Sequence, residues 1–322
     1  MNHVNQGKSY LLLISLLILA LFLTACGKAA GTVGNNKEIN IGYQKNGTSL
    51  TLKNKQALQK DLEKEGYKVK WSEFNTGSSI LEALNAGSID FAGAGDIPSI
   101  FALAKGSDFK FIASEPSSPS SQGILVGKDS QIKSLEDLKG KKVAFNKASI
   151  SQYLLNQSLD SVGLAMSDVE PVYLNPPDAS VAFEQGEVDA WVVWDPYMTV
   201  SESKGNTILK NKDGVPYRTF YFSSSKLANE HPEIVGKFVE HLADAGKEID
   251  QNPTKAAALL QKETNIPKKT WEKVLNRKTS DVNFIDEEAV QDLQAQADIL
   301  LKIGLTEKAV NIDDYVWNPK DK

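Results

Sequence analysis

The chain repeats part of itself at a spacing of about one hundred residues. Gly87-Ser88-Ile89-Asp90 is echoed 99 residues later by Gly186-Glu187-Val188-Asp189. Each motif runs on through an apolar stretch to an aspartate, Asp96 or Asp195, and a proline follows shortly after. General similarity between any two strand–helix units is the simpler explanation, but the matching offsets favour two related lobes. This repeat limits the possible fold more than any other feature of the sequence.

A second pair of segments has a similar spacing. Ile41-Gly42-Tyr43-Gln44-Lys45 is echoed 102 residues later by Val143-Ala144-Phe145-Asn146-Lys147. Each is an apolar strand that ends in an amide and a lysine just before a helical pattern. From Glu38 onward, short apolar runs alternate with helical patterns, which predicts α/β units built on a parallel sheet. The length of 322 residues also favours two domains over one.

The periodicity predicts where the individual elements lie. We expect strands at 38–44, 68–74, 88–94, 109–114, 122–127, 141–146, 170–174, 188–194 and 217–223. We expect helices at 49–66, 78–86, 97–105, 134–138, 150–163, 178–185, 196–203, 231–250, 253–263, 267–275 and 286–303. The last apolar segment, Tyr315-Val316-Trp317, is expected to form a short strand or an extended tail.

The N-terminus is typical of a secreted lipoprotein. Lys8 is the one charge in the leader, and the apolar run Leu11 to Leu23 is shorter than the roughly 20 residues that span a bilayer. The run ends in Leu23-Thr24-Ala25-Cys26-Gly27, which resembles the bacterial lipobox, whose cysteine is acylated and becomes the new N-terminus. We therefore predict a signal peptide over 1–25, lipidation at Cys26 and a flexible tether over 26–37.

Two lobes require a hinge. We predict that lobe 1 comprises residues 38–122 plus 218–322 and that lobe 2 comprises residues 123–217. The chain would then cross between the lobes twice, near 122–126 and 214–220. Two crossings would let the lobes close on a ligand between them.

Composition excludes several classes of protein. The net charge of −5 does not suit nucleic-acid binding, and one cysteine allows neither an intrachain disulfide nor the usual Cys/His metal site. Arg218 and Arg277 are the two arginines, so bidentate arginine clamps are scarce. The sequence contains no G-x-S-x-G elbow, Walker A loop or H-E-x-x-H motif. We expect no enzyme activity, no cofactor and no metal.

The strand-to-helix junctions are the candidate ligand site. Ligands of open α/β sheets bind beyond the carboxyl ends of the strands, where helix N-termini provide unpaired N–H groups for an anion. Helix capping is the alternative role for the polar residues at every junction. Trp194 ends its strand on the opposite face from Trp191 and is expected to face the cleft. The four junctions lie at 44–49, 95–98, 146–151 and 194–196.

These junctions resemble those of the aliphatic-sulfonate-binding proteins of ABC importers, relatives of the taurine- and nitrate-binding proteins. After Asn146-Lys147, Ala148-Ser149-Ile150-Ser151 departs from the Gly-Ser-Asn or Gly-Ser-Ser that often follows in that family. The resemblance spans roughly residues 39–200. It rests on Ile41 to Lys45, Gly47 to Leu50, Leu81 to Phe91, Ser114-Glu115-Pro116, Leu138 to Lys147, Pro171 to Leu174 and Ala190 to Pro196.

The resemblance implies a periplasmic-binding-protein fold with two crossing strands (type II) and a ligand cleft between the lobes. It also implies capture of a small anionic alkanesulfonate, a permease with its ATPase as partners, and no nucleic acid. We expect a monomer, held by its lipid anchor on the extracytoplasmic face of the cell membrane. The expected ligand-binding residues are Gln44, Gly47, Thr48, Ser49, Gly95, Asp96, Ser114, Asn146, Ser149, Ser151, Trp194 and Asp195.

Several alternatives stay open at this point. Taurine, nitrate or a heterocyclic vitamin precursor could replace the alkanesulfonate, and Asp96, Glu115 or Asp195 could hold taurine's ammonium or serve as helix caps. Trp194 or Tyr43 could cover an alkyl tail. An enzyme like the yeast-type thiamine-pyrimidine synthases is a further rival, but those are cytosolic and need a histidine-rich site. The last rival is an adhesion or scaffold lipoprotein with an empty cleft.

Overall fold

The computed structural model describes residues 37–210 and 214–318. The predicted signal peptide, Cys26 and the predicted tether lie outside these residues, apart from Lys37, which begins the first strand. No helix among the described residues is long and apolar enough to cross a membrane.

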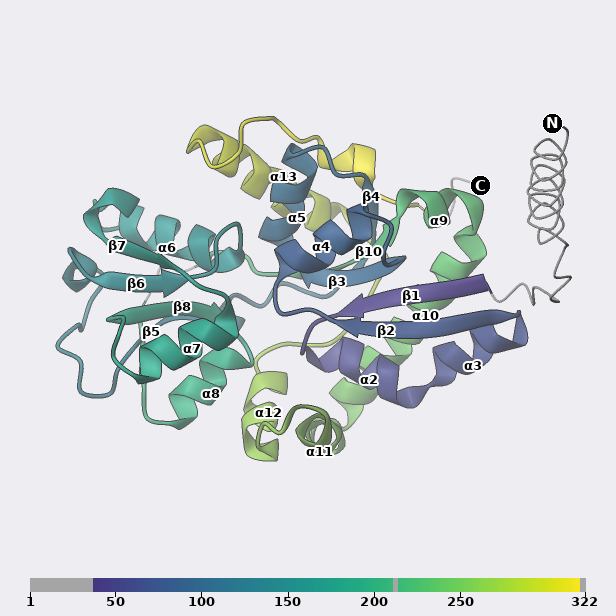
Figure 1. Cartoon of the computed structure of the whole chain (residues 1–322), viewed down its shortest axis with the longest axis horizontal. Helices are drawn as coiled ribbons and strands as arrows, with labels where there is room; N and C mark the ends of the chain where they lie inside the picture. The colour runs from purple at the N-terminus through teal and green to yellow at the C-terminus, as the bar shows by residue number, and fades with distance from the viewer. Residues whose placement is uncertain (1–36, 211–213, 319–322) are drawn as a thin grey trace, which may run out of the picture. The chain divides into compact units, whose positions relative to one another are not determined.

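In the part of the chain that the structure describes, ten strands form two five-stranded sheets within one compact unit (Figure 1). The first sheet has the order β2-β1-β3-β10-β4 and the second has the order β7-β6-β8-β5-β9. The strands of the first sheet are β1 (Lys37–Tyr43), β2 (Tyr67–Glu73), β3 (Phe91–Gly95), β4 (Phe109–Ser114) and β10 (Thr219–Ser224). The strands of the second sheet are β5 (Gln122–Val126), β6 (Lys142–Phe145), β7 (Glu170–Tyr173), β8 (Ala190–Trp194) and β9 (Thr207–Leu209).

Both sheets are mixed, so the prediction of a parallel sheet was wrong in one respect. β1 pairs in parallel with β2 and β3, but β10 is antiparallel to β3 and β4. In the second sheet, β5 is likewise antiparallel to β8 and β9. The apolar pattern of a strand does not depend on its direction, so it could not reveal that these two strands run the other way.

The helices lie against both faces of the sheets, and Figure 1 shows α4 and α5 on one face of the first sheet with α2, α3 and α10 on the other. Helix α10 illustrates the packing: Ile234, Phe238, Leu242, Ala245 and Ile249 recur every three or four residues and are all buried. The first seven helices are α2 (Gly47–Lys55), α3 (Ala57–Lys64), α4 (Gly77–Asn85), α5 (Asp96–Ala104), α6 (Ile150–Asp160), α7 (Pro176–Glu184) and α8 (Tyr197–Ser203). The later ones are α9 (Ser225–Glu230), α10 (Pro232–Gln251), α11 (Pro253–Thr264), α12 (Lys268–Leu275) and α13 (Glu287–Lys302). Short 3₁₀ turns are η1 (Pro119–Ser121), η2 (Glu136–Leu138), η3 (Met166–Asp168) and η4 (Ile312–Tyr315).

The sequence repeat corresponds to a structural repeat. The two strand orders match when β1, β2 and β3 are paired with β6, β7 and β8. Asp90 accepts a hydrogen bond from the backbone N–H of Asn40 at 2.7 Å, and its counterpart Asp189 accepts one from Lys142 at 2.8 Å. Each carboxylate therefore joins the turn before one strand to the backbone of the neighbouring strand, which explains why the aspartate recurs in the sequence.

Some element boundaries differ from the predictions. The predicted helix 49–66 is divided into α2 and α3 because Gln56 has a left-handed backbone (φ 54°), which sequence periodicity does not show. Neither β9 nor α9 was predicted, since each is six residues or shorter. The predicted 134–138 helix is the short turn η2. Val316 makes a single parallel bridge to Phe111, which agrees with a short extended tail.

Candidate ligand-binding site

The candidate site is a cleft at the carboxyl ends of β1, β3 and β8. Its main part encloses about 40 Å³. A second hollow of about 40 Å³ shares Asn46, Asp195, Pro196, Tyr217 and Thr219 with the first, so we treat the two together as the cleft. The main part is lined by Gln44, Lys45, Asn46, Phe74, Asn75, Ala94, Gly95, Trp194, Asp195, Pro196, Tyr197, Tyr217 and Thr219. The second part adds Gly47, Ser121, Trp271, Val274, Leu275 and Lys278.

Two nine-residue helices begin at the cleft. Asn46 is the N-cap of α2, and its side-chain oxygen accepts a hydrogen bond from the N–H of Ser49 at 2.8 Å. Gly95 is the N-cap of α5. The first N–H groups of a helix have no partner within the helix, and the helix dipole places about half a positive charge there. This wall of the cleft therefore favours an anion without using a cationic side chain.

Aromatic side chains form much of the remaining wall. Trp194 ends β8, and Tyr197 begins α8 beyond Pro196. Phe74 follows β2, and Tyr217 comes from the crossing before β10. Burial raises the pKa of Tyr217, and the charges of Asp96, Asp195 and Glu115 raise it further, so this phenol stays neutral. The wall can pack against an apolar group and still donate hydrogen bonds.

The two crossings between the sheets run side by side behind the cleft. The backbone N–H of Glu115 donates to the carbonyl oxygen of Thr219 at 2.9 Å, and that of Ser118 donates to Tyr217 at 2.7 Å. Both crossing segments thus share one hydrogen-bonded ladder. The second predicted crossing, 214–220, lies here, but the first was misplaced: the chain crosses over 115–121, and the predicted 122–126 forms β5 of the second sheet. Tyr217 and Thr219, at the end of the second crossing, line the cleft.

Each charged side chain of the described residues lining the cleft has an opposite charge beside it. Lys45 lies 3.2 Å from Glu73, and both are a little over one-third exposed. Lys278 pairs with Glu115, which is buried and also accepts from Thr48 and Tyr221 at 2.7 Å. Asp195 pairs with Arg277. Side-chain charges therefore cancel locally, and the helix ends set the sign of the field in the cleft.

Asp195 is held from several directions. Its Oδ1 accepts from the backbone N–H of Thr199 at 3.0 Å, from the Thr199 hydroxyl at 2.6 Å and from Arg277 Nη1 at 3.3 Å. Its Oδ2 accepts from the same Arg277 nitrogen at 3.1 Å. Burial raises the pKa of Asp195, and the Arg277 charge offsets part of that rise. Asp195 is thus both a cap for α8 and half of an ion pair.

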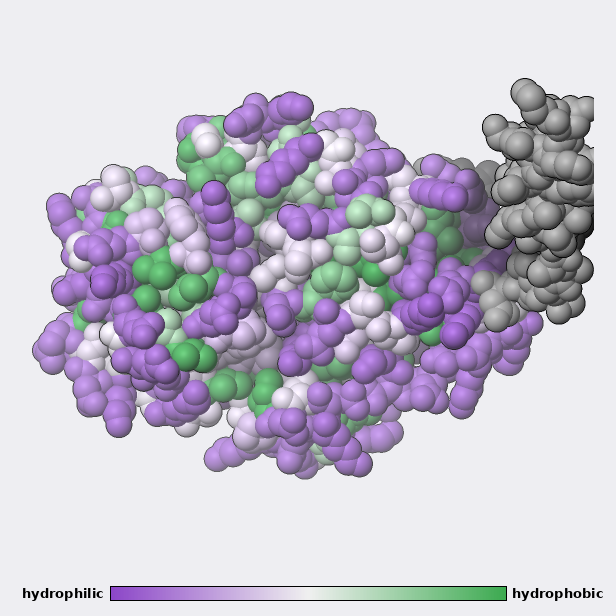
Figure 2. Space-filling view, viewed as in Figure 1, coloured by the Kyte–Doolittle hydropathy of each residue, from purple (hydrophilic) through white to green (hydrophobic). Residues whose placement is uncertain are grey.

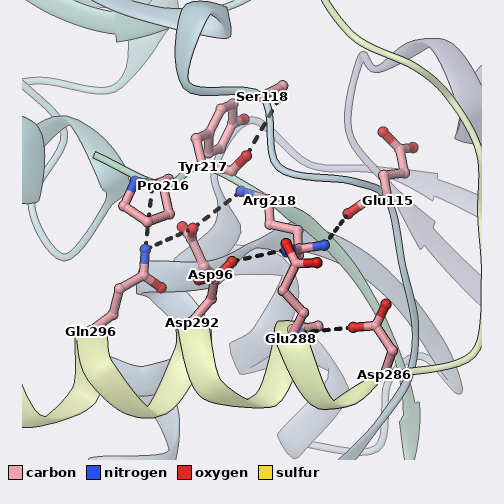
Figure 3. Close-up of polar contacts among 11 residues, drawn as sticks. Asp96, Glu115, Ser118, Pro216, Tyr217, Arg218, Asp286, Glu288, Asp292 and Gln296 are labelled. Atoms are coloured by element: carbon pink, nitrogen blue, oxygen red, sulfur yellow. Dashed lines mark hydrogen bonds and ion pairs between the residues drawn. The ribbon is translucent and has the colours of Figure 1, made fainter. Parts of the chain in front are cut away.

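Asp96 lies behind the cleft rather than in its lining. Figure 3 shows its carboxylate between the crossing strand and α13, where it accepts from the backbone N–H of Arg218 at 3.1 Å and from Gln296 at 3.0 Å. It also accepts from the backbone N–H of Ile97 at 2.8 Å. Burial raises its pKa to about 6. The guanidinium of Arg218 pairs with Asp292 at 2.8 Å. Asp96 therefore fastens the start of α5 to the second crossing.

The predicted site residues divide into two groups. The first group lines the cleft and comprises Gln44, Gly47, Gly95, Trp194 and Asp195. The second group lies outside that lining and comprises Thr48, Ser49, Asp96, Ser114, Asn146, Ser149 and Ser151. Thr48 and Ser49 point into the buried network around Glu115 and Tyr221, and Ser114 pairs with Asn283 through its backbone. Whether the members of either group bind a ligand stays a prediction.

The third junction stands apart from the other three. Ser149 caps α6 by accepting from the N–H of Ser151 at 3.2 Å. Ala148 occupies a left-handed conformation (φ 54°), where glycine would be relaxed. The side-chain oxygens of Asn146 and Ser151 are buried and have no hydrogen-bond partner among the described residues.

Sequence reasoning missed part of the cleft. Asn46 and Lys45 belonged to a predicted junction but were not chosen, and proximity to Gln44 was the signal for both. Trp271 and Lys278 come from the C-terminal helical region, and no local motif marks them. Arg277 was noticed as one of two arginines, yet its position against Asp195 depends on the fold.

The fold and the site together define a class. Two mixed sheets joined by two crossings, with a cleft at the carboxyl ends of the strands, form the periplasmic-binding-protein fold. Among residues 37–210 and 214–318, no group of three or more His, Cys, Asp or Glu side chains could hold a metal ion. The protein is a substrate-binding protein of this fold.

Comparison with known proteins identifies the family. The NMT1/THI5-like family model matches residues 62–256. Proteins named "Putative aliphatic sulfonates-binding protein" from Escherichia coli K12 and Bacillus subtilis 168 are each 35% identical to this chain, over 94% and 95% of it and 96% and 94% of their own lengths. The alkanesulfonate-binding protein SsuA from Xanthomonas axonopodis pv. citri, solved bound to MOPS, superposes with a TM-score of 0.81 at 34% identity, covering 87% of this chain and 98% of that one.

The chain belongs to the aliphatic-sulfonate-binding family within the NMT1/THI5-like group. This confirms the predicted family and fold class. These relatives are named as sulfonate-binding proteins, so the expectation that the chain is a binding protein and not an enzyme is also confirmed.

Proposed function

We propose that this chain captures small alkanesulfonates in the cleft. The observation that carries the proposal is the pair of helix N-termini, α2 at Asn46 and α5 at Gly95, which meet in a cleft whose side-chain charges cancel. A sulfonate is ionised at any cellular pH and has three acceptor oxygens. Hydrogen bonds from neutral donors to an ionised acceptor are stronger than hydrogen bonds between two neutral groups. Micromolar affinity requires a binding free energy of only about −8 kcal/mol, which a few such bonds can supply.

The shape of the cleft supports a ligand with one anionic end and one apolar end. Gln44, Asn46 and Asn75 offer amide donors beside the helix ends. Trp194 and Phe74 offer flat apolar surface for a short alkyl chain. The names of the relatives from Escherichia coli and Bacillus subtilis support the same ligand class.

The captured ligand would be delivered to an ABC permease and its ATPase. We place the protein on the extracytoplasmic face of the membrane, attached through lipid on Cys26 and a short tether. In this proposal, residues 38–122 plus 218–322 move against residues 123–217 when the cleft opens.

We also propose that the protein acts as a monomer. Figure 2 shows polar and charged residues over most of one face, with apolar residues in small separate patches. Among the described residues, the exposed large apolar side chains are Tyr173, Val181, Phe284, Leu301 and Ile303. Tyr173 and Val181 belong to β7 and α7, Phe284 precedes α13, and Leu301 and Ile303 lie at the end of α13, whereas a stable homodimer interface is normally apolar and continuous.

Calorimetry on the full chain, purified in mild detergent, tests the ligand. Ethanesulfonate, hexanesulfonate, taurine, sulfate and nitrate are titrated in turn. We expect the two alkanesulfonates to bind tightly and sulfate to bind weakly, because sulfate cannot use the aromatic wall. Binding of taurine, nitrate or a heterocycle in their place would keep the importer role and change the ligand. No heat with any alkanesulfonate would refute the ligand class and favour a scaffold role.

A matched pair of variants locates the binding. Trp194→Ala removes apolar surface from the cleft. It is expected to weaken the binding of hexanesulfonate about tenfold or more, which is equivalent to ~1.4 kcal/mol of apolar contact. Trp317→Ala removes the same side chain from a surface hollow formed with Lys110 and Pro232 and is expected to leave affinity unchanged. Equal losses in both variants would place the ligand elsewhere.

A further inference from the structure

Among the described residues that line the cleft, Asp195 is the only one with an acidic side chain. A ligand with both a sulfonate and an ammonium group would need such a carboxylate for its cationic end. The sequence left open whether Asp195 serves a ligand or the protein, and the surrounding hydrogen bonds now bear on that question.

Oδ1 of the Asp195 carboxylate already accepts three hydrogen bonds, and Oδ2 accepts one from Arg277. An ionised carboxylate has about four acceptor positions. The backbone and hydroxyl of Thr199 take two of them, at 3.0 and 2.6 Å, and Arg277 Nη1 lies 3.3 and 3.1 Å from the two oxygens. Only 5% of the Asp195 side chain is exposed.

Arg277 is fixed independently of Asp195. Its Nη1 also donates to the Thr199 hydroxyl at 2.7 Å, and its Nη2 donates to Glu202 at 2.6 Å. Lys273, one helical turn earlier, lies 2.6 Å from the same glutamate. The arginine follows α12 and its partners lie on α8, so the guanidinium reaches from one sheet's helices to the other's.

We propose that Arg277 determines specificity by occupying Asp195 and so excluding ligands that carry an ammonium group. The inference rests on the proposed function and names which sulfonates the cleft prefers. An ammonium at Asp195 would have to displace hydrogen bonds that are already made, and it would lie beside the positive guanidinium. The other lining charges give no alternative, because Lys45 and Lys278 are cations. The cleft thus takes sulfonates whose tails are uncharged.

The test compares two ligand pairs that differ by one amino group: ethanesulfonate with taurine, and propanesulfonate with 3-aminopropanesulfonate. Calorimetry is done on the full chain in detergent at several pH values between 6 and 8.5, because burial raises the pKa of Asp195. We expect the wild type to prefer the uncharged tail by at least tenfold in each pair. Arg277→Met is expected to reduce that preference at least tenfold at the upper end of the pH range.

Three further variants separate this role from a structural one. Lys273→Met removes the neighbouring contact to Glu202 and is expected to leave the preference unchanged. Adding Asp195→Asn to Arg277→Met is expected to abolish the gain in taurine binding. Asp195→Asn alone, which retains an oxygen for Thr199, is expected to leave the preference as in the wild type.

The outcomes distinguish the two proposals. If Asp195→Asn alone weakens taurine more than ethanesulfonate, the carboxylate already serves the ammonium and the inference is wrong. An unchanged preference in folded Arg277→Met also overturns it, while alkanesulfonate capture stands. If the wild type binds neither member of a pair, both proposals are overturned. Thermal unfolding of each variant shows that it is folded before it is titrated.

Discussion

Asp96 should make the stability of this protein fall as pH rises through the mildly acidic range. Its side chain is buried, and burial raises its pKa from the ordinary value of 3.8 to about 6. The folded protein therefore holds the proton more tightly than the unfolded chain does. The stabilisation is complete below the unfolded pKa and is lost as pH rises through the folded one.

The size of the effect follows from the difference between the two pKa values. That difference is about two pH units, and each unit corresponds to ~1.4 kcal/mol. Part of this difference lies below pH 4 and above pH 7, so the contribution of Asp96 to the free energy of unfolding should decrease by about 2 kcal/mol between pH 4 and pH 7. Because the residue is 1% exposed, little of this is lost to solvent screening.

Urea unfolding of the wild type and Asp96→Asn at pH 4, 5, 6 and 7 measures it. Asparagine does not titrate. If its NH₂ group replaces the oxygen that accepts from the Arg218 N–H, that hydrogen bond is lost, so the variant should be less stable by a roughly constant ~1–3 kcal/mol at every pH. The advantage of the wild type should shrink by about 2 kcal/mol from pH 4 to pH 7. Other titrating groups are common to both proteins and cancel.

Asp137→Asn is the control of opposite sign. Backbone N–H groups of Lys133 and Ser134 donate to Asp137, which lowers its pKa, so here the wild type should gain on the variant as pH rises. Parallel stability curves for wild type and Asp96→Asn would refute the reasoning, because they would mean that Asp96 titrates alike in the folded and unfolded chain.

Two further predictions concern a helix and the leader. A Cβ at Gly246 in α10 would lie 1.8 Å from the carbonyl oxygen of Ser280, so Gly246→Ala should destabilise the protein by ~2–3 kcal/mol. A Cβ at Gly236 in the same helix would meet no atom within 4 Å, so Gly236→Ala should stabilise the protein by up to ~1 kcal/mol. Denaturant unfolding measures both, and a gain at Gly246 would contradict the close approach. Cys26→Ser should abolish labelling by radioactive fatty acid and leave the uncleaved precursor, while Lys28→Ala should behave as the wild type; labelling of the serine variant would disprove the lipobox.

Much of the fold was predictable from local pattern. Strand and helix positions followed from apolar periodicity, and the repeated Gly-x-x-Asp motif marked equivalent turns in both sheets, where Asp90 and Asp189 make the same backbone contact. Helix capping at the junctions was also predicted, and Ser149 caps α6, because a cap acts on the next three residues. At the first junction Thr48 or Ser49 was expected to be the cap, but the cap is Asn46. The residues that make such short-range interactions are neighbours in the sequence, so the local sequence is enough to predict them.

The direction of strands and the interruption of helices were not predictable in this way. β5 and β10 run antiparallel to their neighbours because each follows a crossing between the sheets. Gln56 breaks a long helical pattern although its neighbours are good helix formers. These features depend on the path of the chain through the fold, and apolar periodicity carries no information about that path.

The sequence by itself predicted an anion site at strand-to-helix junctions, and residues of three of the four junctions line the cleft. The tertiary structure alone decided which residues at those junctions face the cleft: Gly95 does, and its neighbour Asp96 turns away to the crossing strand. It also decided that Asp195 is paired with Arg277, 82 residues further along the chain. The physical reason is that the pairing and the pKa of a charged side chain depend on the groups within a few ångströms of it. Those groups come from distant parts of the chain and meet only when it folds.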